Sequence, residues 1–373
     1  MGEWAFVGAV TLLVAAVAGH MVQVHTPESV YDVDQVVLLA LVSVAGLIVT
    51  MKLIPIVKEK CLKAGLYGRD INKTGDSKIP ESLGIVSATV CIMSVICFQW
   101  VFRETLGVFN AALIAMSMML FLGFADDVLD LRWRDKVLLS YVAAVPLLFG
   151  YNGGTQIVMP RPLHPYLGHM VDLGFLYYAY MINTVVWCTN SINIYAGING
   201  LETGQSVVMA FFVIVHNCLQ LGTAEEHQHV LSIFIMLPFL TTGLALTYFN
   251  WFPSEVFVGD TFTYFAGMTL AVCGILGHFS KTLVILFVPQ ILNFVLSIPQ
   301  LLHIIPCPRH RLPKLDRKTG KLNYSNNGTL INAWLYLFGP RTEKELCRHL
   351  VAFQVLCCTV GLVIRHQGAI MFY

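Results

Sequence analysis

The chain has 373 residues, of which 56% are hydrophobic and only 12% are charged. This composition lies outside the range of soluble globular domains and indicates a polytopic membrane protein. The formal net charge of +1 gives no reason to expect nucleic-acid binding, and the ten cysteines have neither a regular spacing nor a CxxC motif. We expect these cysteines to be small buried hydrophobes rather than disulfides or metal ligands.

Ten predominantly apolar runs have the length of helices that cross a bilayer about 30 Å thick. They occupy approximately residues 36–57, 84–102, 107–125, 137–151, 174–192, 204–221, 230–249, 262–279, 282–305 and 347–364. The sequence therefore predicts an all-α bundle of about ten transmembrane helices. A further apolar stretch at 5–19 lacks the basic flank of a cleaved signal, and whether it forms an extra span is left open.

Counted as spans, these runs place the segments 58–83, 126–136, 193–203, 250–261 and 306–346 on one face of the membrane. That face carries most of the lysines and arginines between the spans, in 58–83, 126–136 and 306–346. Because basic loops stay on the cytosolic side of a membrane, we expect these segments to face the cytosol. We divide the chain into an N-terminal extension, 1–35, and an integral membrane domain, 36–373, with the cytosolic loop 306–346 inserted before the last helix.

The first basic loop, RDINKTGDSKIPESLG, places Glu81 after a proline at the start of a membrane helix. A carboxylate at this position can simply interact with the positive end of the helix dipole. It can equally well face a binding site, and the residue alone does not decide between the two.

Three carboxylates, Asp126, Asp127 and Asp130, follow the third apolar run in the sequence FADDVLDLRWRDK. Carboxylates so close together repel one another and resist dehydration, so a cation should compensate them. If the helix continues through the cluster, Asp126 and Asp130 share a face and Lys136 can fold back over them.

The segment TNSINIYAGINGLE combines Asn190, Asn193, Asn199 and Glu202 with two glycines at the end of an apolar run. Amide oxygens at such a place suit a hard cation such as Mg²⁺, and amide groups also bind the edge of a nucleobase. Each asparagine taken alone can equally be a helix cap.

Two further segments supply an acid and two arginines. Asp260 follows a glycine at a helix start in NWFPSEVFVGDTF, where it is either an N-cap or a metal ligand. In HIIPCPRHRLPKL, prolines order the loop that carries Arg309, His310 and Arg311, and guanidinium groups bind phosphate oxygens. The stretch at 329–339 is too short to span and predicts an interfacial or re-entrant helix.

Clustered acids, amides, a lysine and two arginines at the cytosolic mouth of a helical bundle indicate a site for a Mg²⁺-bound diphosphate. Phosphoryl transfer mainly needs the reacting groups to be held in line, with a metal ion and cationic side chains beside the phosphates. The predicted site lies at a bilayer surface, which indicates one soluble substrate and one lipid substrate. The alternative of an ion-coupled transporter predicts acidic residues near the middle of the spans.

Several segments resemble the eukaryotic branch of the polyprenyl-phosphate hexose-1-phosphate transferase superfamily. They are NKTGDSKIPES, LGFADDVLDLRWR, NIYAGINGLE, FVGDTFTYFAGM, GILGHFSKT and LLHIIPCPRHR. The resemblance extends from about residue 36 to the C-terminus. It implies transfer of GlcNAc-1-phosphate from UDP-GlcNAc to dolichyl phosphate, with Mg²⁺, by a tunicamycin-sensitive homodimer in the endoplasmic reticulum membrane. A related transferase with another sugar or polyprenol is the alternative.

The resemblance also implies roles for individual residues. Asn193 and Asp260 would coordinate Mg²⁺, Asp126 and Asp127 would support the metal and the acceptor phosphate, and Lys136 and Arg309 would hold the donor diphosphate. Uracil and ribose would lie near Ile71, Glu81, Asn199 and Phe257, with Trp133, His310 and Arg311 beside the GlcNAc. The third acidic position varies in the superfamily, so metal contact by Asp130 is left open. We expect direct attack by dolichyl phosphate, with Asp127 as a covalent nucleophile as the rival mechanism.

Overall fold

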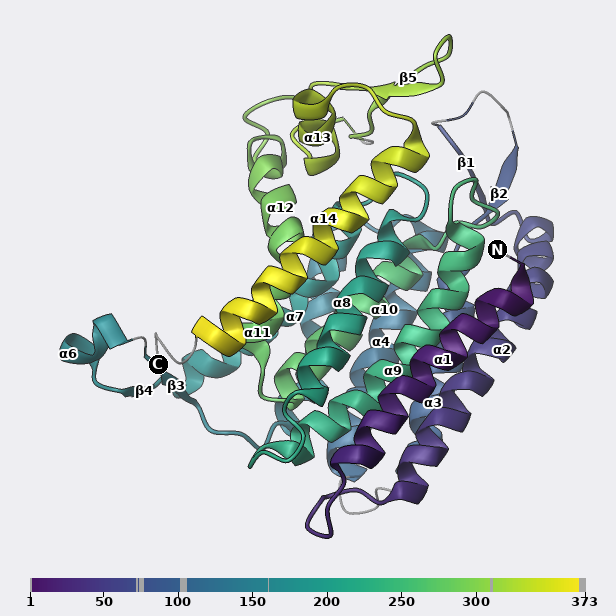
Figure 1. Cartoon of the computed structure of the whole chain (residues 1–373). Coiled ribbons are helices and arrows are strands. Elements are labelled where there is room, and N and C mark those ends of the chain that lie inside the picture. The colour runs from purple at the N-terminus through teal and green to yellow at the C-terminus, as the bar shows by residue number, and fades with distance from the viewer. Residues whose placement is uncertain are drawn as a thin grey trace.

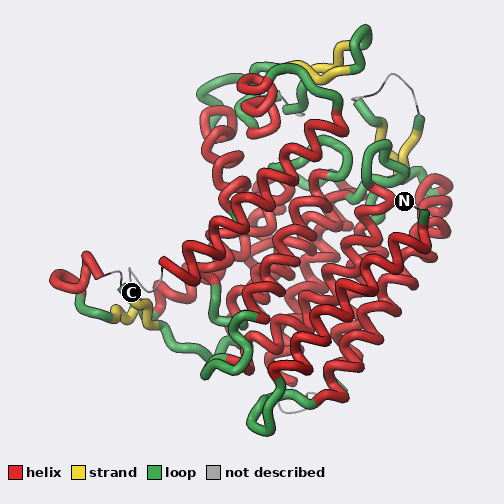
Figure 2. The backbone as a smooth tube through the Cα atoms, in the orientation of Figure 1, coloured by secondary structure: helices red, strands yellow, loops and turns green. Residues whose placement is uncertain are grey.

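The computed structural model describes residues 2–71, 73, 77–100, 106–159, 161–308 and 311–368. Its described part is a bundle of long helices with three short hairpins at the ends, which confirms the all-α membrane fold class (Figures 1 and 2). The hairpins are antiparallel and each has two strands.

The helices are α1 (Glu3–Val24), α2 (Val33–Lys63), α3 (Gly84–Gln99), α4 (Leu106–Leu129), α5 (Trp133–Gly150), α6 (His164–Leu167), α7 (Phe175–Ile194), α8 (Leu201–Cys218), α9 (Glu226–Asn250), α10 (Gly259–Leu276), α11 (Ser280–Leu286), α12 (Val288–Leu301), α13 (Leu330–Phe338) and α14 (Glu343–Val363), with the short turns η2 (Arg161–Leu163) and η3 (Ile364–Gly368). The strands are β1 (Tyr67–Arg69), β2 (Lys78–Pro80), β3 (Gln156–Val158), β4 (Met170–Asp172), β5 (Lys314–Asp316) and β6 (Lys321–Asn323).

Helices α9 and α10 form the centre of the bundle. Every residue from Thr261 to Leu276 in α10 is buried, because the helix packs against α4, α7, α9 and α3. Helix α9 is covered by α8, α2 and α3. A helix that is apolar on all sides is stable only when it is surrounded by other helices or lipid, and here other helices surround both.

The hairpins lie at opposite ends of the bundle (Figure 1). β1–β2, β5–β6 and α13 lie at one end, and β3–β4 with α6 lies at the other. The segment before α10 pairs with the β1–β2 hairpin at the first end, since Phe257 N–H donates to the Pro80 carbonyl at 2.8 Å. Segments that are distant in sequence therefore meet at the end that carries the predicted basic loops.

The run predicted as a single span at 282–305 is broken. Helices α11 and α12 meet at Phe287 with a bend of 67°. Pro289 is the second residue of α12, and a proline lacks the N–H that a continuing helix would need and constrains the residue before it. The buried polar residues of α12, which are Gln290, Asn293, Ser297 and Gln300, face other protein segments rather than lipid.

Six of the described helices are long and apolar enough to cross a membrane, or seven if the bent α11–α12 pair counts as one span. Helix α1 is one of the six, so the undecided stretch at 5–19 lies in a helix, which packs mainly on α2. The short helix expected at 329–339 is present as α13. The count of ten spans stays a prediction.

Candidate active site

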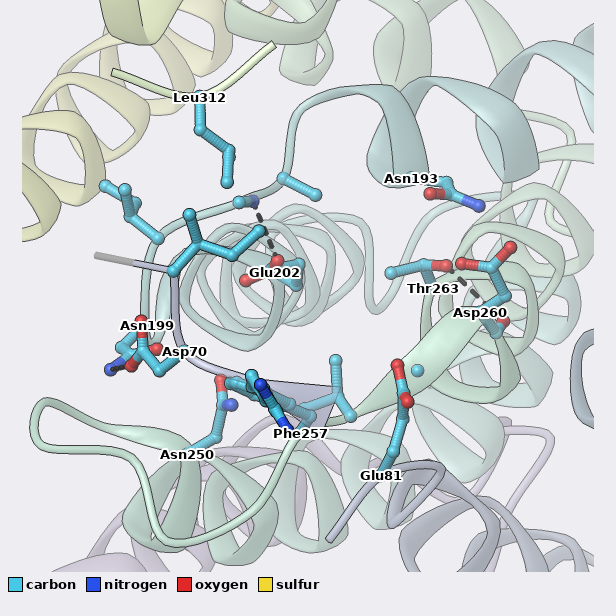
Figure 3. Close-up of a pocket in the computed structure, with 17 residues that line it drawn as sticks. Asp70, Glu81, Asn193, Asn199, Glu202, Asn250, Phe257, Asp260, Thr263 and Leu312 are labelled. Atoms are coloured by element: carbon cyan, nitrogen blue, oxygen red, sulfur yellow. Dashed lines mark hydrogen bonds between the residues drawn. The ribbon is translucent and has the colours of Figure 1, made fainter. Parts of the chain in front are cut away.

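A cavity of about 280 Å³ opens where the β1–β2 hairpin, the 195–200 loop and the segment before α10 meet. Figure 3 shows Asn193, Thr263 and Asp260 at one end, which we call the acidic end. Asp70 and Asn199 lie at the other, which we call the loop end. The remaining lining residues are Arg69, Ile71, Glu81, Ala196, Gly197, Ile198, Glu202, Asn250, Phe257, Val258, Gly259 and Leu312.

Three helices bring a lysine between two aspartates at the acidic end. Lys136 Nζ, from α5, lies 2.6 Å from Asp126 Oδ2 on α4 and 3.6 Å from Asp260 Oδ2 on α10. Asp126 is buried, and its other oxygen accepts a hydrogen bond from the Leu131 N–H at 3.0 Å. The cation expected to compensate the aspartates is therefore Lys136, although it lies 124 positions before Asp260 in the sequence.

Asp127 caps a helix to which it does not belong. Its Oδ1 accepts the N–H of Asp260 at 2.7 Å, and its Oδ2 accepts the N–H of Thr261 at 3.2 Å and the Thr261 hydroxyl at 2.5 Å. The first N–H groups of a helix have no partner inside the helix, and Val258 provides no side-chain cap for α10. Asp127, on α4, thus accepts hydrogen bonds from the first free N–H groups of α10 and positions the main chain of Asp260.

Two glycines permit this contact. Gly259 has a φ of +72°, and a Cβ there would overlap the Asp127 carboxylate. A Cβ at Gly123 on α4 would overlap the Asp260 carbonyl and the Thr261 Cα on α10. The close approach of α4 to α10 therefore depends on a missing side chain at Gly123, one turn before the aspartates.

The aspartates lie at helix ends. Asp126 and Asp127 are in the last turn of α4, which ends at Leu129, and Asp260 is in the first turn of α10. Asp130 is exposed and has a φ of +50°, so the helix does not continue through it and the shared face expected for Asp126 and Asp130 does not form. The transporter hypothesis predicts acids near the middle of the spans, whereas these aspartates lie at helix ends.

The wall between the two ends carries an aromatic ring and a carboxylate. The Phe257 ring lies against Gly68 of β1, and both Phe257 and Ile71 line the cavity. Glu81 also lines it, and burial raises the pKa of the Glu81 carboxyl, with a further increase from the negative charge of Asp127. A flat ring beside hydrogen-bonding groups suits a nucleobase and its ribose.

The residues expected beside the sugar are Trp133, His310 and Arg311, and the two that the structure describes, Trp133 and Arg311, are not among the residues that line the cavity. Trp133 is 68% exposed and does not line the cavity. Arg311 is partly buried, its Nη1 has no hydrogen-bond partner among the described residues, and burial lowers the pKa of its guanidinium. Arg309 and His310 lie outside the described residues. An incompletely paired guanidinium near Leu312, which lines the cavity, is available for an anion.

The described residues contain no group of three or more His, Cys, Asp or Glu side chains arranged to hold a metal. Asn193 and Asp260 nevertheless line the same end of the cavity and offer one amide oxygen and one carboxylate. Mg²⁺ typically takes few protein ligands and completes its coordination with phosphate oxygens and water. The residues present therefore fit a Mg²⁺–diphosphate complex better than a closed protein metal site.

Sequence reasoning did not single out Asp70, Asn250 and Thr263 as site residues, although all three line the cavity. It also missed Glu343, whose Oε1 accepts the Asn199 N–H at 2.8 Å. Asp70 is one charged residue among several in a polar loop, and Glu343 is an ordinary acid in the first turn of a helix. Only their spatial contacts distinguish them from surface carboxylates.

The chain is similar to known proteins over most of its length. The family model described as glycosyl transferase family 4 matches residues 109–278. A Dictyostelium discoideum protein named UDP-N-acetylglucosamine--dolichyl-phosphate N-acetylglucosaminephosphotransferase is 49% identical over 355 residues, which are 87% of each chain. Proteins of the same name from Schizosaccharomyces pombe and Saccharomyces cerevisiae are 37% and 36% identical, and the matches cover 87% and 88% of this chain and 90% and 91% of theirs.

Proposed function

Because the chain belongs to glycosyl transferase family 4, we propose that it transfers GlcNAc-1-phosphate from UDP-GlcNAc to dolichyl phosphate, forming GlcNAc-diphosphodolichol and UMP. This would be the first step of dolichol-linked oligosaccharide synthesis for protein N-glycosylation. The observation that carries the proposal is the meeting of Asp126, Lys136 and Asp260 beside a cavity whose other end suits a nucleotide.

The two ends of the cavity suggest how the donor lies. Its uracil and ribose would occupy the loop end and the adjoining wall, near Ile71, Asn199, Phe257 and Glu81. Its diphosphate would then extend toward the acidic end. Arg311 Nη1, which has no partner among the described residues, supports an anion near the cavity, because an unpaired nitrogen of a partly buried guanidinium is costly until an anion pairs with it. Arg309, His310 and Trp133 remain proposed contacts of the diphosphate and the sugar.

Asn193 and Asp260 are the residues that would hold Mg²⁺, with Asp126 and Asp127 supporting them. When bound, the ion would supply Lewis-acid stabilisation of charge on the diphosphate oxygens. Lys136 is positioned to stabilise the same oxygens, since its ammonium already lies between Asp126 and Asp260. Positioning and charge compensation are the main demands of phosphoryl transfer.

The reaction itself would be a direct displacement. An oxygen of dolichyl phosphate forms a bond to the β-phosphorus of UDP-GlcNAc, the bond from that phosphorus to the bridging oxygen breaks, and UMP leaves with the bridging oxygen. Both oxygens of Asp127 already accept hydrogen bonds from Asp260 and Thr261. Attack by Asp127 would have to break the cap of α10, which favours direct transfer over a covalent enzyme intermediate.

The remaining features of the proposal concern the membrane. The enzyme would cross the endoplasmic reticulum membrane with about ten helices, place this cavity on the cytosolic side, and act as a homodimer. The lysines and arginines of 58–83, 126–136 and 306–346 support this orientation, because basic residues are retained on the cytosolic side. Residues 36–373 would form the catalytic domain and 1–35 an N-terminal extension.

The test is a transfer assay with the purified full-length protein. UDP-GlcNAc, UDP-GalNAc and UDP-MurNAc-pentapeptide would each be offered with dolichyl or undecaprenyl phosphate, with and without Mg²⁺ and tunicamycin. We expect Mg²⁺-dependent, tunicamycin-sensitive release of UMP with UDP-GlcNAc and dolichyl phosphate. Preference for another sugar or lipid would identify a related transferase, and failure of every pair would overturn the proposal.

A further inference from the structure

Asn199 is held by two carboxylates from different parts of the chain. Its main-chain N–H donates to Glu343 Oε1 at 2.8 Å, at the start of α14. Its side-chain Nδ2 donates to Asp70 Oδ2 at 3.0 Å, in the loop after β1. The Asn199 side chain is buried and also lines the cavity, so these two contacts fix a residue that a ligand can touch.

The carboxylate of Asp70 decides which amide atom Asn199 offers to the cavity. An amide can rotate by half a turn and exchange a donor for an acceptor at the same place. A carboxylate only accepts hydrogen bonds, so the Asn199 atom that faces Asp70 must be Nδ2. Asn199 Oδ1 is then the atom left for a ligand. The two hydrogen bonds of Asn199 use its main-chain N–H and Nδ2, and within the described part of the chain Oδ1 accepts none.

Asp70 is itself supported. Lys73 Nζ lies 2.7 Å from the same Asp70 oxygen and compensates its charge. The Lys73 ammonium also lies 5.2 Å from the centre of the Phe252 ring, a cation–π contact that links it to the segment before α10. The Asp70 side chain is only 7% exposed, so it has little freedom to turn away from Asn199.

We propose that Asp70 is a specificity-determining residue that acts through Asn199, by presenting a fixed hydrogen-bond acceptor to the nucleobase of the donor. The inference rests on the proposed function for the identity of the donor and goes beyond it in naming the residue that selects the base. An acceptor at this place suits uracil, whose ring N3–H is a donor. It repels cytosine, whose unprotonated N3 is an acceptor at the same position of the ring.

Discrimination between bases can be large at such a site. A ligand that lacks the N–H leaves the buried acceptor without a hydrogen-bond partner, and that loss weakens its binding. Asparagine at position 70 would have nearly the same shape but could either donate or accept. It would therefore allow Asn199 to turn in both directions. The substitution should weaken the choice of base without removing any group that lies at the acidic end.

The experiment compares the wild-type protein with Asp70→Asn and Asp70→Ala, using UDP-GlcNAc, CDP-GlcNAc and an N3-methyluridine analogue of the donor. For Asp70→Asn we expect the KM for UDP-GlcNAc to rise about tenfold with kcat within about twofold, as for loss of a binding contact. The preference for UDP-GlcNAc over each of the other donors, measured as a ratio of kcat/KM, should fall about tenfold or more. Because the ratio is taken within one variant, it does not depend on the fraction of protein that is folded.

Two further variants separate orientation from charge. Lys73→Met leaves the Asp70 carboxyl in place but removes the cation that compensates it, so it should lower the donor ratio less than Asp70→Asn does. Asp316→Asn changes an acid at the end of β5, outside the cavity lining, and should behave as wild type. Calorimetric binding of UMP and CMP gives the same comparison for a variant without turnover.

The outcomes are distinct. Loss of discrimination in Asp70→Asn, with a smaller loss in Lys73→Met, supports the proposal. An unchanged donor ratio in Asp70→Asn would overturn it. A wild-type protein that transfers no sugar phosphate from UDP-GlcNAc, yet prefers UMP to CMP through Asp70, would refute the proposed function and leave the role of Asp70 intact.

Discussion

The two ends of the cavity are built in different ways. At the acidic end, the side chains of Asp126, Lys136 and Asp260 stand on the ends of packed helices, and α10 below them is buried on all sides. At the loop end, Asp70 and Asn199 stand on loops that are joined by side-chain hydrogen bonds. The difference predicts that catalysis depends on rigid helix packing, whereas recognition of the proposed donor depends on contacts between loops.

The largest expected effect is at the acidic end. Asp260→Asn removes a charge that faces Lys136 and the proposed metal, and we expect kcat to fall by about 10³-fold or more, with little change in folding. Steady-state transfer assays measure this. The matched control is Glu255→Gln, an exposed acid outside the cavity lining that pairs with Lys58. Wild-type turnover in Asp260→Asn would remove Asp260 from the site.

A second change tests whether helix packing positions the aspartates. Gly123→Ala adds a methyl group where α4 touches α10, so the helices must separate. Because misplacement of catalytic groups by about 1 Å can cost 10²-fold in rate, we expect a loss of that order. Gly107→Ala, on the same helix, meets no atom within 4 Å and should leave the activity unchanged. Equal activity of the two variants would show that the contact does not matter.

The third change concerns Asp127. Asp127→Asn keeps one acceptor for the start of α10 but loses the charge, so unfolding should become easier by about 1 kcal/mol and kcat should fall by roughly tenfold to hundredfold. Thermal unfolding in detergent and transfer assays measure both. Complete loss of turnover in a fully folded Asp127→Asn, together with a trapped phosphosugar adduct on the wild-type enzyme, would revive the covalent mechanism.

The smallest effect is expected at the wall of the cavity. Since burial raises the pKa of Glu81 in the folded chain, that chain holds the Glu81 proton at a pH where the unfolded chain has lost it. The contribution of Glu81 to the free energy of unfolding therefore falls as the pH rises above the pKa of Glu81 in the unfolded chain. We expect Glu81→Gln to gain thermal stability relative to wild type as the pH rises above 4.5, the ordinary pKa of a glutamate. A difference that does not change with pH would contradict the burial of this charge.

Much of the acidic end was predictable because its residues carry local signals. Asp126 and Asp127 directly follow a long apolar run, Asp260 follows a glycine at a helix start, and like charges at a membrane boundary require a cation such as Lys136. The break at Phe287 was missed because the span at 282–305 was predicted from apolar composition, which is the same in a straight and a bent helix. Pro289, just after the break, is the sequence signal that could have found it.

The apolar periods, the basic loops and the acids at helix ends thus determined the fold class and the chemical character of the site. Only the tertiary structure decided that Asp127 caps α10 rather than facing the cavity, and that Asp70 and Glu343 hold Asn199. Such contacts join residues more than 100 positions apart through single hydrogen bonds. Their geometry follows from how the helices pack, which no local pattern of residues encodes.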